Sequence, residues 1–300
     1  MASVASGRSL SRAIAPYAFV LPPVIYLGVF MFGPLGRQIW MSLTNTRIIN
    51  PNAGRYIGLR NFERLFSDSG FYDSLRITAL YAAASVVLGV MAGVISALAI
   101  NQPFRGRAIV RAILLFGWAA PNVATSLIWL WMYNGQSGVF NDIAMALGLE
   151  RINWLTSAEM ALPSILIVTV WQTAPFVMLV ILAALQSTPE EVKEAARIDG
   201  ADRLNVFRNV TLPHILPSVQ LVSLLTAVWA IRRFDIIYLL TGGGPLGSTS
   251  TLVVKIRQTA FENYELGMAS AYGVIGLVLA LLVAAVHFIV ERKRAQWMAR

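Results

Sequence analysis

The sequence predicts an all-α integral membrane protein with six transmembrane helices. Apolar residues make up 57% of its 300 residues and charged residues only 13%, against roughly 25% charged residues in soluble domains. The charged residues gather in short stretches, and the long windows between them contain none. This composition excludes a water-soluble enzyme, a disordered chain and a fibrous protein.

Six apolar windows approach or exceed the roughly 20 residues that a helix needs to cross a bilayer. They are Ala13–Phe32, Ile77–Ile100, Ala112–Tyr133, Ala161–Gln186, Ile215 to about Leu240, and Met268–Val290. The first contains three prolines, which membrane helices tolerate, and its length favours a retained span over a cleaved signal peptide. We expect Pro121 to break the third window. Arg232, Arg233 and Asp235 interrupt the fifth.

The lysine and arginine residues predict the orientation of the chain in the membrane. Six spans place both termini on one side, where thirteen of these residues gather in short segments, whereas nine lie in longer loops on the other side. We therefore expect both termini in the cytoplasm. The expected organisation is a cytoplasmic N-terminus at 1–12, a first helix with an external segment at 13–76, a transmembrane core at 77–290 and a basic cytoplasmic tail at 291–300.

The net charge of +9 and the absence of cysteine limit the possible functions further. Without thiols the chain has no disulfide, no thiolate metal site and no cysteine nucleophile. His214 and His287 are too far apart in sequence to form a metal-binding motif. The positive charge is explained by the membrane orientation and the surrounding lipid, so no nucleic-acid partner is expected.

The loop between the fourth and fifth windows, Gln186–Pro217, is the most informative segment. Ser187 or Thr188 is expected to cap a helix with Pro189 in its first turn, and Gly200 is expected to end it. A second short helix is expected from about Ala201 to Asn209. Small residues on one face of this pair would let a partner approach the backbone closely, which indicates a docking surface. By composition alone, a solvated connecting loop explains the segment equally well.

Several motifs then resemble a known family. The loop reads Glu194-Ala195-Ala196, three residues, Gly200, and then Val210-Thr211-Leu212-Pro213. Further matches are Tyr56-Ile57-Gly58-Leu59-Arg60-Asn61-Phe62 with Phe71 and Thr78, Trp171-Gln172-Thr173-Ala174-Pro175-Phe176, and Phe234–Pro245 with Ser248-Thr249. From about Ala13 to Arg294 the chain resembles the permease subunits of binding-protein-dependent ABC importers, in the branch that takes up carbohydrates.

The resemblance implies a location in a bacterial inner membrane, a fold, partners and functional residues. The fold would be that of type I (MetI-like) ABC importer permeases, and the segment 187–214 would be the EAA coupling loop that sits in a groove of a cytoplasmic ATPase. The implied coupling residues are Glu194, Ala195, Ala196, Asp199, Gly200, Leu212 and Pro213. The implied partners are a second, homologous permease, two copies of the ATPase and an external substrate-binding protein. The chain contains no phosphate-binding Gly-rich motif of the Walker type. ATP and magnesium would therefore bind the ATPase, and this chain would have no cofactor and no catalytic residue.

Polar residues within the apolar windows are candidates for the substrate path, because a charge within a span costs about 2.5–3.5 kcal/mol and normally faces a cavity or a partner. Arg232 and Asp235 could instead pair with each other on one helix face. Asn122, Thr125 and Trp129 form a stripe at helical spacing. The full candidate set is Asn122, Thr125, Trp129, Gln172, Arg232, Arg233, Asp235, Tyr238, Gly243 and Tyr272.

Other functions remain possible on the sequence alone. An ion-coupled secondary transporter would need carboxylates within the membrane, and Asp235 is the only one. A membrane enzyme would need a catalytic constellation, which is not evident. Because Arg233 adds a second guanidinium beside Arg232, an anionic sugar or glycerol phosphate is an alternative to a neutral sugar as substrate.

Overall fold

The computed structural model describes residue 17 and residues 19–298, the side chains as far as residue 293. Within these residues the regular structure is helical, with two isolated β-bridges and no strand, which confirms the all-α prediction. The chain forms two compact units, residues 68–257 with 275–300, and residues up to 67 with 258–274. The expected N-terminal segment at 1–12, the start of the first window at residues 13–16, and residues 299 and 300 of the basic tail lie outside the described residues.

The smaller unit contains the first span. This span runs over Phe19–Ser42, through a π-helical turn η1 (Gly28–Phe32) and the helix α2 (Gly33–Ser42). The predicted end at Phe32 is therefore wrong by ten residues. Pro34 does not stop the helix because it lies in the first turn of α2, directly after the π-helical turn, where its missing N–H costs little.

In the rest of the smaller unit, the segment after the first span packs against the start of the last helix. It contains α3 (Arg60–Ser67), the π-helical turn η3 (Gln258–Glu262) and the start of α14 (Leu266–Met298). Gly267 donates a backbone hydrogen bond of 2.9 Å to the Thr46 carbonyl and lies against the Thr44 carbonyl, where a Cβ atom would collide with the backbone. Glycine is therefore required for this close approach.

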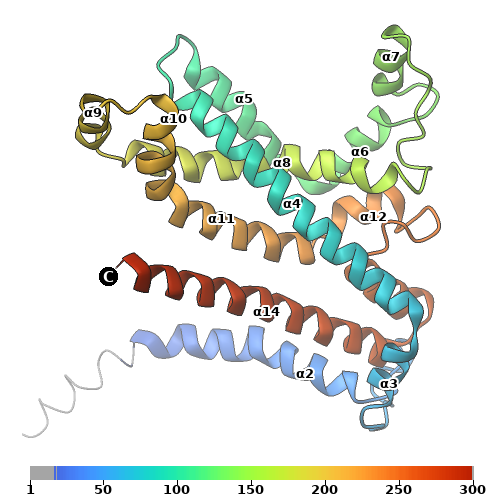
Figure 1. Cartoon of the computed structure of the whole chain (residues 1–300). Coiled ribbons are helices and arrows are strands. Elements are labelled where there is room, and N and C mark those ends of the chain that lie inside the picture. Colours follow the sequence, from blue (N-terminus) through green and yellow to red (C-terminus); the bar gives the residue numbers. More distant parts are fainter. Residues whose placement is uncertain (1–16, 18, 299–300) are drawn as a thin grey trace, which may run out of the picture. The chain divides into compact units, whose positions relative to one another are not determined.

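The larger unit is built around three long helices, α4 (Ser69–Asn101), α8 (Ala161–Gln186) and α11 (Leu212–Ile231) (Figure 1). The helix α4 packs along α8, and α11 packs against both. Their interface is apolar, with Val177, Met178 and Ile181 fully buried. Gly93 of α4 touches Val177 so closely that a Cβ atom would not fit. The bounds of α8 confirm the fourth window, and α4 starts eight residues earlier than predicted because Asp68 caps it through the Gly70 amide at 2.9 Å.

Two of the expected spans are broken. The third consists of α5 (Arg107–Ala119) and α6 (Asn122–Met132), which meet at an angle of 99°. This confirms the expected break at Pro121. The fifth window is not one helix, because α11 ends at Ile231 and α12 (Asp235–Thr241) starts after a gap. In the part of the chain that the structure describes, five helices are long and apolar enough to cross a membrane, or six with the bent pair as one span.

The loop between α8 and α11 also differs in detail from the prediction. Its helices are α9 (Glu190–Ile198) and α10 (Arg203–Val206), and a π-helical turn η2 (Phe207–Thr211) joins α10 directly to α11. The cap of the second helix is Asp202, whose side chain accepts from the Asn205 amide at 2.7 Å. Ser187 and Thr188 are not N-caps, because their hydroxyls bond to the Ala184 carbonyl at the end of α8.

Shorter helices complete the larger unit. They are α7 (Val139–Ala146) and α13 (Leu252–Arg257). The buried Asn141 of α7 holds the following loop, because its Oδ1 accepts from the Ile152 amide and the Trp154 indole. The last helix, α14, extends beyond the predicted window at both ends and belongs to both units.

Candidate functional site

A polar cavity lies where the two broken spans of the larger unit meet. Its volume is about 360 Å³, and its walls come from α5, α6, α8, α11 and the break before α12. The lining residues are Trp118, Asn122, Gln172, Thr173, Trp229, Arg232, Arg233, Phe234 and Asp235. Irregular backbone at membrane depth is tolerated where it lines a cavity or is buried in protein. The positions of both breaks therefore point to the cavity as a functional feature.

Four side chains in the cavity form a continuous hydrogen-bonded chain. Arg233 Nη1 donates to Gln172 Oε1 at 2.6 Å, Gln172 Nε2 donates to Asn122 Oδ1 at 2.7 Å, and Asn122 Nδ2 donates to Asp235 Oδ2 at 3.1 Å. The chain thus links a guanidinium to a carboxylate through two amides from α8 and α6. Each end of the chain compensates the charge of the other, which lowers the cost of holding both among apolar helices.

The helix ends around the carboxylate favour its charge. Asp235 is the first residue of α12, and Asn122, which bonds to it, is the first residue of α6. The N-terminal end of a helix bears partial positive charge from its free N–H groups, so a carboxylate there is stabilised. The breaks therefore supply both the space for the polar chain and part of its electrostatic support.

The expected ion pair between Arg232 and Asp235 is absent in this described part of the chain, and that alternative is wrong. The i, i+3 spacing brings side chains together only on a continuous helix, and the backbone between Ile231 and Asp235 is not helical. Asp235 instead bonds to Asn122, and Arg232 lines the cavity without a partner among the described residues.

Some of the predicted path residues lie elsewhere. Thr125 and Trp129 are buried in α6 and do not line the cavity, and Trp129 packs against Trp171 and Phe140 with ring centroids 5.7 and 5.6 Å apart. The predicted polar-aromatic stripe therefore contributes only Asn122 to the cavity.

The remaining predicted residues support the segment after the cavity or lie in the other unit. Tyr238 stacks on Phe234 at 4.9 Å and lies under the guanidinium of Arg257 at 4.1 Å. Gly243 has a left-handed φ of 96°, which suits the turn that follows α12. Tyr272 is buried in the smaller unit and does not line this cavity.

The sequence reasoning missed the aromatic wall of the cavity. Trp118 stacks on Phe176 at 5.7 Å, and Phe176 contacts Trp229 at 4.9 Å. Trp118 precedes the break at Pro121 and Trp229 precedes Arg232, each by three residues. A search for aromatic residues one turn before Pro121 and one turn before the charged residues that interrupt the fifth window would have found both tryptophans.

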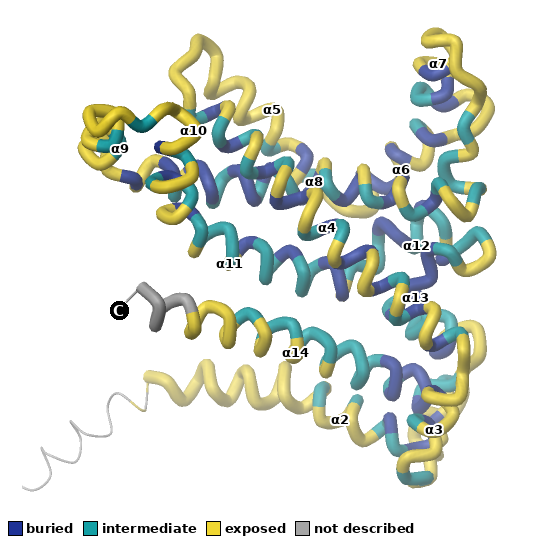
Figure 2. Tube along the Cα trace, viewed as in Figure 1, coloured by how far each residue is buried: buried dark blue, intermediate teal, exposed yellow. Residues whose placement is uncertain are grey.

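The segment α9–α10 has the opposite character, because its residues are mostly exposed (Figure 2). Among the predicted coupling residues, Glu194, Ala195, Asp199, Gly200 and Pro213 are exposed, and Ala196 and Leu212 are half-buried. Gly200 has a left-handed φ of 86° and open space around its Cα atom. The structure therefore brings these residues to one accessible end of the larger unit.

Large apolar side chains are exposed in the same segment. Ile198 is 85% exposed, Leu204 62% and Val192 49%. Exposed apolar groups beside charged ones are typical of a surface that binds another protein. Within α9 the carboxyl of Glu190 accepts from Lys193 at 2.9 Å, and this hydrogen bond with the ammonium charge holds the pKa of Glu190 below its ordinary value.

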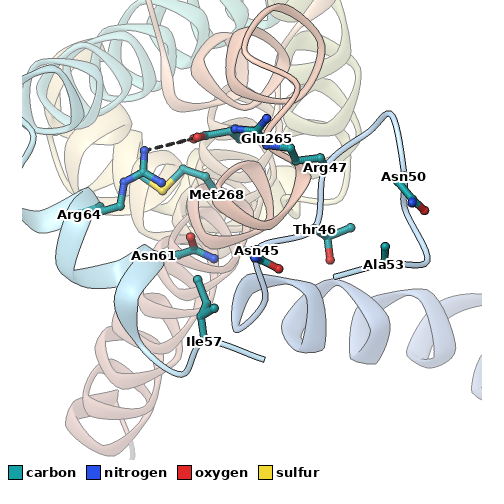
Figure 3. Close-up of a pocket in the computed structure, with 10 residues that line it drawn as sticks. All are labelled: Asn45, Thr46, Arg47, Asn50, Ala53, Ile57, Asn61, Arg64, Glu265 and Met268. Atoms are coloured by element: carbon teal, nitrogen blue, oxygen red, sulfur yellow. Dashed lines mark hydrogen bonds and ion pairs between the residues drawn. The ribbon is translucent and has the colours of Figure 1, made fainter. Parts of the chain in front are cut away.

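A second polar pocket, of about 480 Å³, lies within the smaller unit (Figure 3). It is flanked by Arg64, which pairs with Glu265 at 3.3 Å. The buried Asn61 belongs to a motif that supported the family resemblance, and its Nδ2 donates to the carbonyls of Ser42 and Thr44, both at 2.8 Å. This motif residue therefore fixes the chain at the end of the first span. Thr78, from the same motif, lies in the larger unit, where its hydroxyl oxygen accepts a hydrogen bond of 2.9 Å from the Leu252 amide.

A bundle of broken apolar helices around a polar cavity, with an exposed helical segment at one end, is the architecture of a membrane transport protein. The family described as binding-protein-dependent transport system inner membrane component matches residues 86–296, and the chain belongs to this family. The expected permease fold is thereby confirmed. Neither an ion-coupled secondary transporter nor a membrane enzyme receives support from this membership.

Similar proteins are permeases of the same kind. The chain is 37% identical over 281 residues to the trehalose/maltose transport system permease protein MalF of Thermococcus litoralis, covering 93% of this chain and 94% of that protein. It is 33% identical to the sulfoquinovosyl glycerol transport system permease protein SmoG of Agrobacterium fabrum, covering 91% and 89%. A solved bacterial alginate ABC transporter, in complex with its alginate pentasaccharide-bound periplasmic protein, shares the fold, with a TM-score of 0.83, 23% identity and coverage of 95% and 96%.

Proposed function

We propose that this chain is the permease subunit of an ATP-driven importer for a carbohydrate. The observation that supports this proposal most is the polar cavity at the two helix breaks, which offers a solute a hydrogen-bonding site among apolar helices. The two relatives named above are permeases for trehalose or maltose and for sulfoquinovosyl glycerol, and this similarity supports a sugar or sugar derivative as the substrate.

The chemistry of the cavity suits a sugar. Gln172 and Asn122 each offer both a donor and an acceptor, as a sugar hydroxyl does. A hydroxyl that enters between them can accept from Gln172 Nε2 and donate to Asn122 Oδ1, which replaces their own 2.7 Å bond without loss. The indoles of Trp118 and Trp229 supply apolar faces for the sugar ring. Among the candidate residues, Asn122, Gln172, Arg232, Arg233 and Asp235 therefore form the proposed substrate path.

The segment 187–214 is the proposed coupling element. Its exposed α9 would sit in a groove of an ATPase subunit, with the small side chains of Ala195 and Ala196 and the bare backbone of Gly200 at the contact. Movement of two ATPase subunits would then reach the cavity directly, because α10 and η2 continue into α11, which ends at Ile231, next to the cavity residue Arg232. The breaks next to the cavity are the proposed hinges of alternating access.

The remaining assembly follows from this arrangement. Both termini and the coupling element would face the cytoplasm, and a second, homologous permease would complete the translocation path. An external binding protein would deliver the sugar on the opposite side, as the periplasmic protein in the alginate complex suggests. The domain organisation expected from the sequence, with its core at 77–290, belongs to this proposal. ATP and magnesium would bind the ATPase subunits.

Co-purification of the ATPase with tagged permease tests the coupling element. Gly200→Trp places a large side chain on the contact surface, and we expect most of the ATPase to be lost. The matched control is Gly106→Trp, at an exposed glycine that also has a left-handed φ of 86° but lies between α4 and α5. Both substitutions strain the backbone similarly, so only a docking role predicts a difference between them. Equal retention of the ATPase in the two variants would contradict the proposal.

A further inference from the structure

A cavity of about 960 Å³ lies between the proposed coupling element and the ends of the long helices α4 and α8. Its walls come from the end of α4 with the following residues Gln102 and Pro103, from the end of α8, and from α9, α10 and η2. All of these segments belong to the larger unit. The substrate cavity at the helix breaks has a separate lining.

One part of this cavity is apolar and another part is basic. Leu98, Leu185 and Phe207 supply apolar surface where the long helices end. Lys193, Arg197 and Arg203 supply three cationic groups from the coupling segment. A ligand that fits both parts has an apolar portion and an anionic portion.

The carboxylates of the cavity do not neutralise all of its cations. Glu190 already contacts both Lys193, at 2.9 Å, and Arg197, at 3.7 Å. Asp202 accepts from the Asn205 amide as the cap of α10. Arg203 forms no ion pair within the described residues. At least one guanidinium in the cavity is therefore available to an external anion.

The position of the cavity along the helices indicates the source of that anion. The apolar helix α4 ends at Asn101 and the apolar helix α8 ends at Gln186, and the cavity lies at both ends. Where apolar membrane helices end, the hydrocarbon core gives way to lipid headgroups. Basic pockets between membrane helices on the cytoplasmic side suit anionic headgroups.

We propose that this cavity binds the phosphate group of an anionic phospholipid, with Arg203 as the main contact and the acyl chains toward Leu98 and Leu185. The proposal rests on the proposed function only for its assignment to the cytoplasmic leaflet. A lipid held there contacts the end of α4 and the coupling element at the same time. Anionic lipid would thereby stabilise the position of the coupling element relative to the membrane helices.

Native mass spectrometry of the assembled transporter tests this site. The complex is taken from nanodiscs with equal amounts of phosphatidylglycerol and phosphatidylcholine, and the lipids that remain bound are counted. We expect the wild type to retain phosphatidylglycerol selectively and Arg203→Gln to retain about fivefold less, since one basic residue at a membrane surface contributes about that factor. Arg203→Lys keeps the charge and is expected to retain the lipid. Arg208→Gln, in the same loop but outside the cavity lining, is the matched control and is also expected to retain it.

Three results would overturn the proposal. Equal retention of both lipids, or equal retention by wild type and Arg203→Gln, would show that the cavity does not select an anionic headgroup. Displacement of the lipid by inorganic phosphate would show a site for a soluble phosphate. Selective retention by the isolated chain but not by the assembled transporter would show that a partner protein fills the cavity. Sugar uptake by the wild type is measured on the same samples. If the wild type retains the lipid but takes up no sugar, the result counts against the proposed function alone.

Discussion

The polar cavity at the helix breaks and the proposed coupling element differ in the surroundings of their polar side chains. The cavity joins residues from three parts of the sequence, and three hydrogen bonds link its four polar side chains from Arg233 to Asp235. The proposed coupling element is one contiguous stretch, and most residues of its helices α9 and α10 are exposed, large apolar ones among them. The cavity therefore depends on the fold of this chain, whereas the exposed side chains of the proposed coupling element are free to contact another protein. Substitutions in the two regions should therefore affect different measurements.

The largest effect is expected from breaking the polar chain in the middle. Gln172→Leu removes the hydrogen-bond partner of Arg233 Nη1 and of Asn122 Oδ1. Asn122 keeps its bond to Asp235, so the larger cost falls on the half-buried guanidinium of Arg233. An unsatisfied buried polar group costs about 1–3 kcal/mol, more for a charged one. We expect sugar uptake to fall roughly tenfold or more while the ATPase still co-purifies. Gln186→Leu, the same substitution at the exposed end of α8, is the control. Similar uptake in both variants would remove the polar chain from the substrate path.

A series of charge-neutralising substitutions tests the two charged ends of the hydrogen-bonded side chains in the cavity. Arg233→Gln leaves Asp235 uncompensated, and Asp235→Asn leaves Arg233 uncompensated, so each should reduce the thermal stability of the transporter. The double variant restores a neutral chain of four hydrogen-bonding groups. We expect it to be more stable than the sum of the single effects predicts, by about 0.5–3 kcal/mol. Additive losses in melting temperature would show that the charges act independently.

A smaller effect on stability is expected in the coupling segment. Ile198→Ser removes an apolar side chain that is 85% exposed, and exposed substitutions usually change stability by no more than about 0.5 kcal/mol. The melting temperature should therefore be unchanged while ATPase affinity falls several-fold. A fall in melting temperature without loss of affinity would mean that Ile198 packs within the chain and does not face a partner.

The smallest effect concerns the pH dependence of α9. The Lys193 partner lowers the pKa of Glu190 in the folded helix, so the contribution of this pair is present above the ordinary glutamate pKa and is lost as pH falls through the lowered value. Amide exchange in α9, corrected for the intrinsic rate, should rise at acidic pH in the wild type. In Glu190→Gln this additional rise should be absent. An identical pH response in both would show that the pair does not stabilise α9.

The sequence predicted the helices better than the cavity, for physical reasons. The charge-free window at 161–186 had only one way to bury its apolar residues in a membrane, and α8 has those bounds. The segment at 187–214 was recognisable because its residues are adjacent in the chain. The bond between Asn122 and Asp235 joins residues 113 positions apart, and it depends on two helix breaks of which only one was expected. The end of the first span was misjudged because a π-helical turn admits Pro34.

The most direct test compares the energy sources of uptake by the complete transporter in sealed vesicles with the binding protein outside. The account predicts that sugar accumulates when ATP is enclosed with the ATPase and that an imposed proton or sodium gradient without ATP drives none. Accumulation on the ion gradient alone would contradict the central claim that this chain is moved by a separate ATPase.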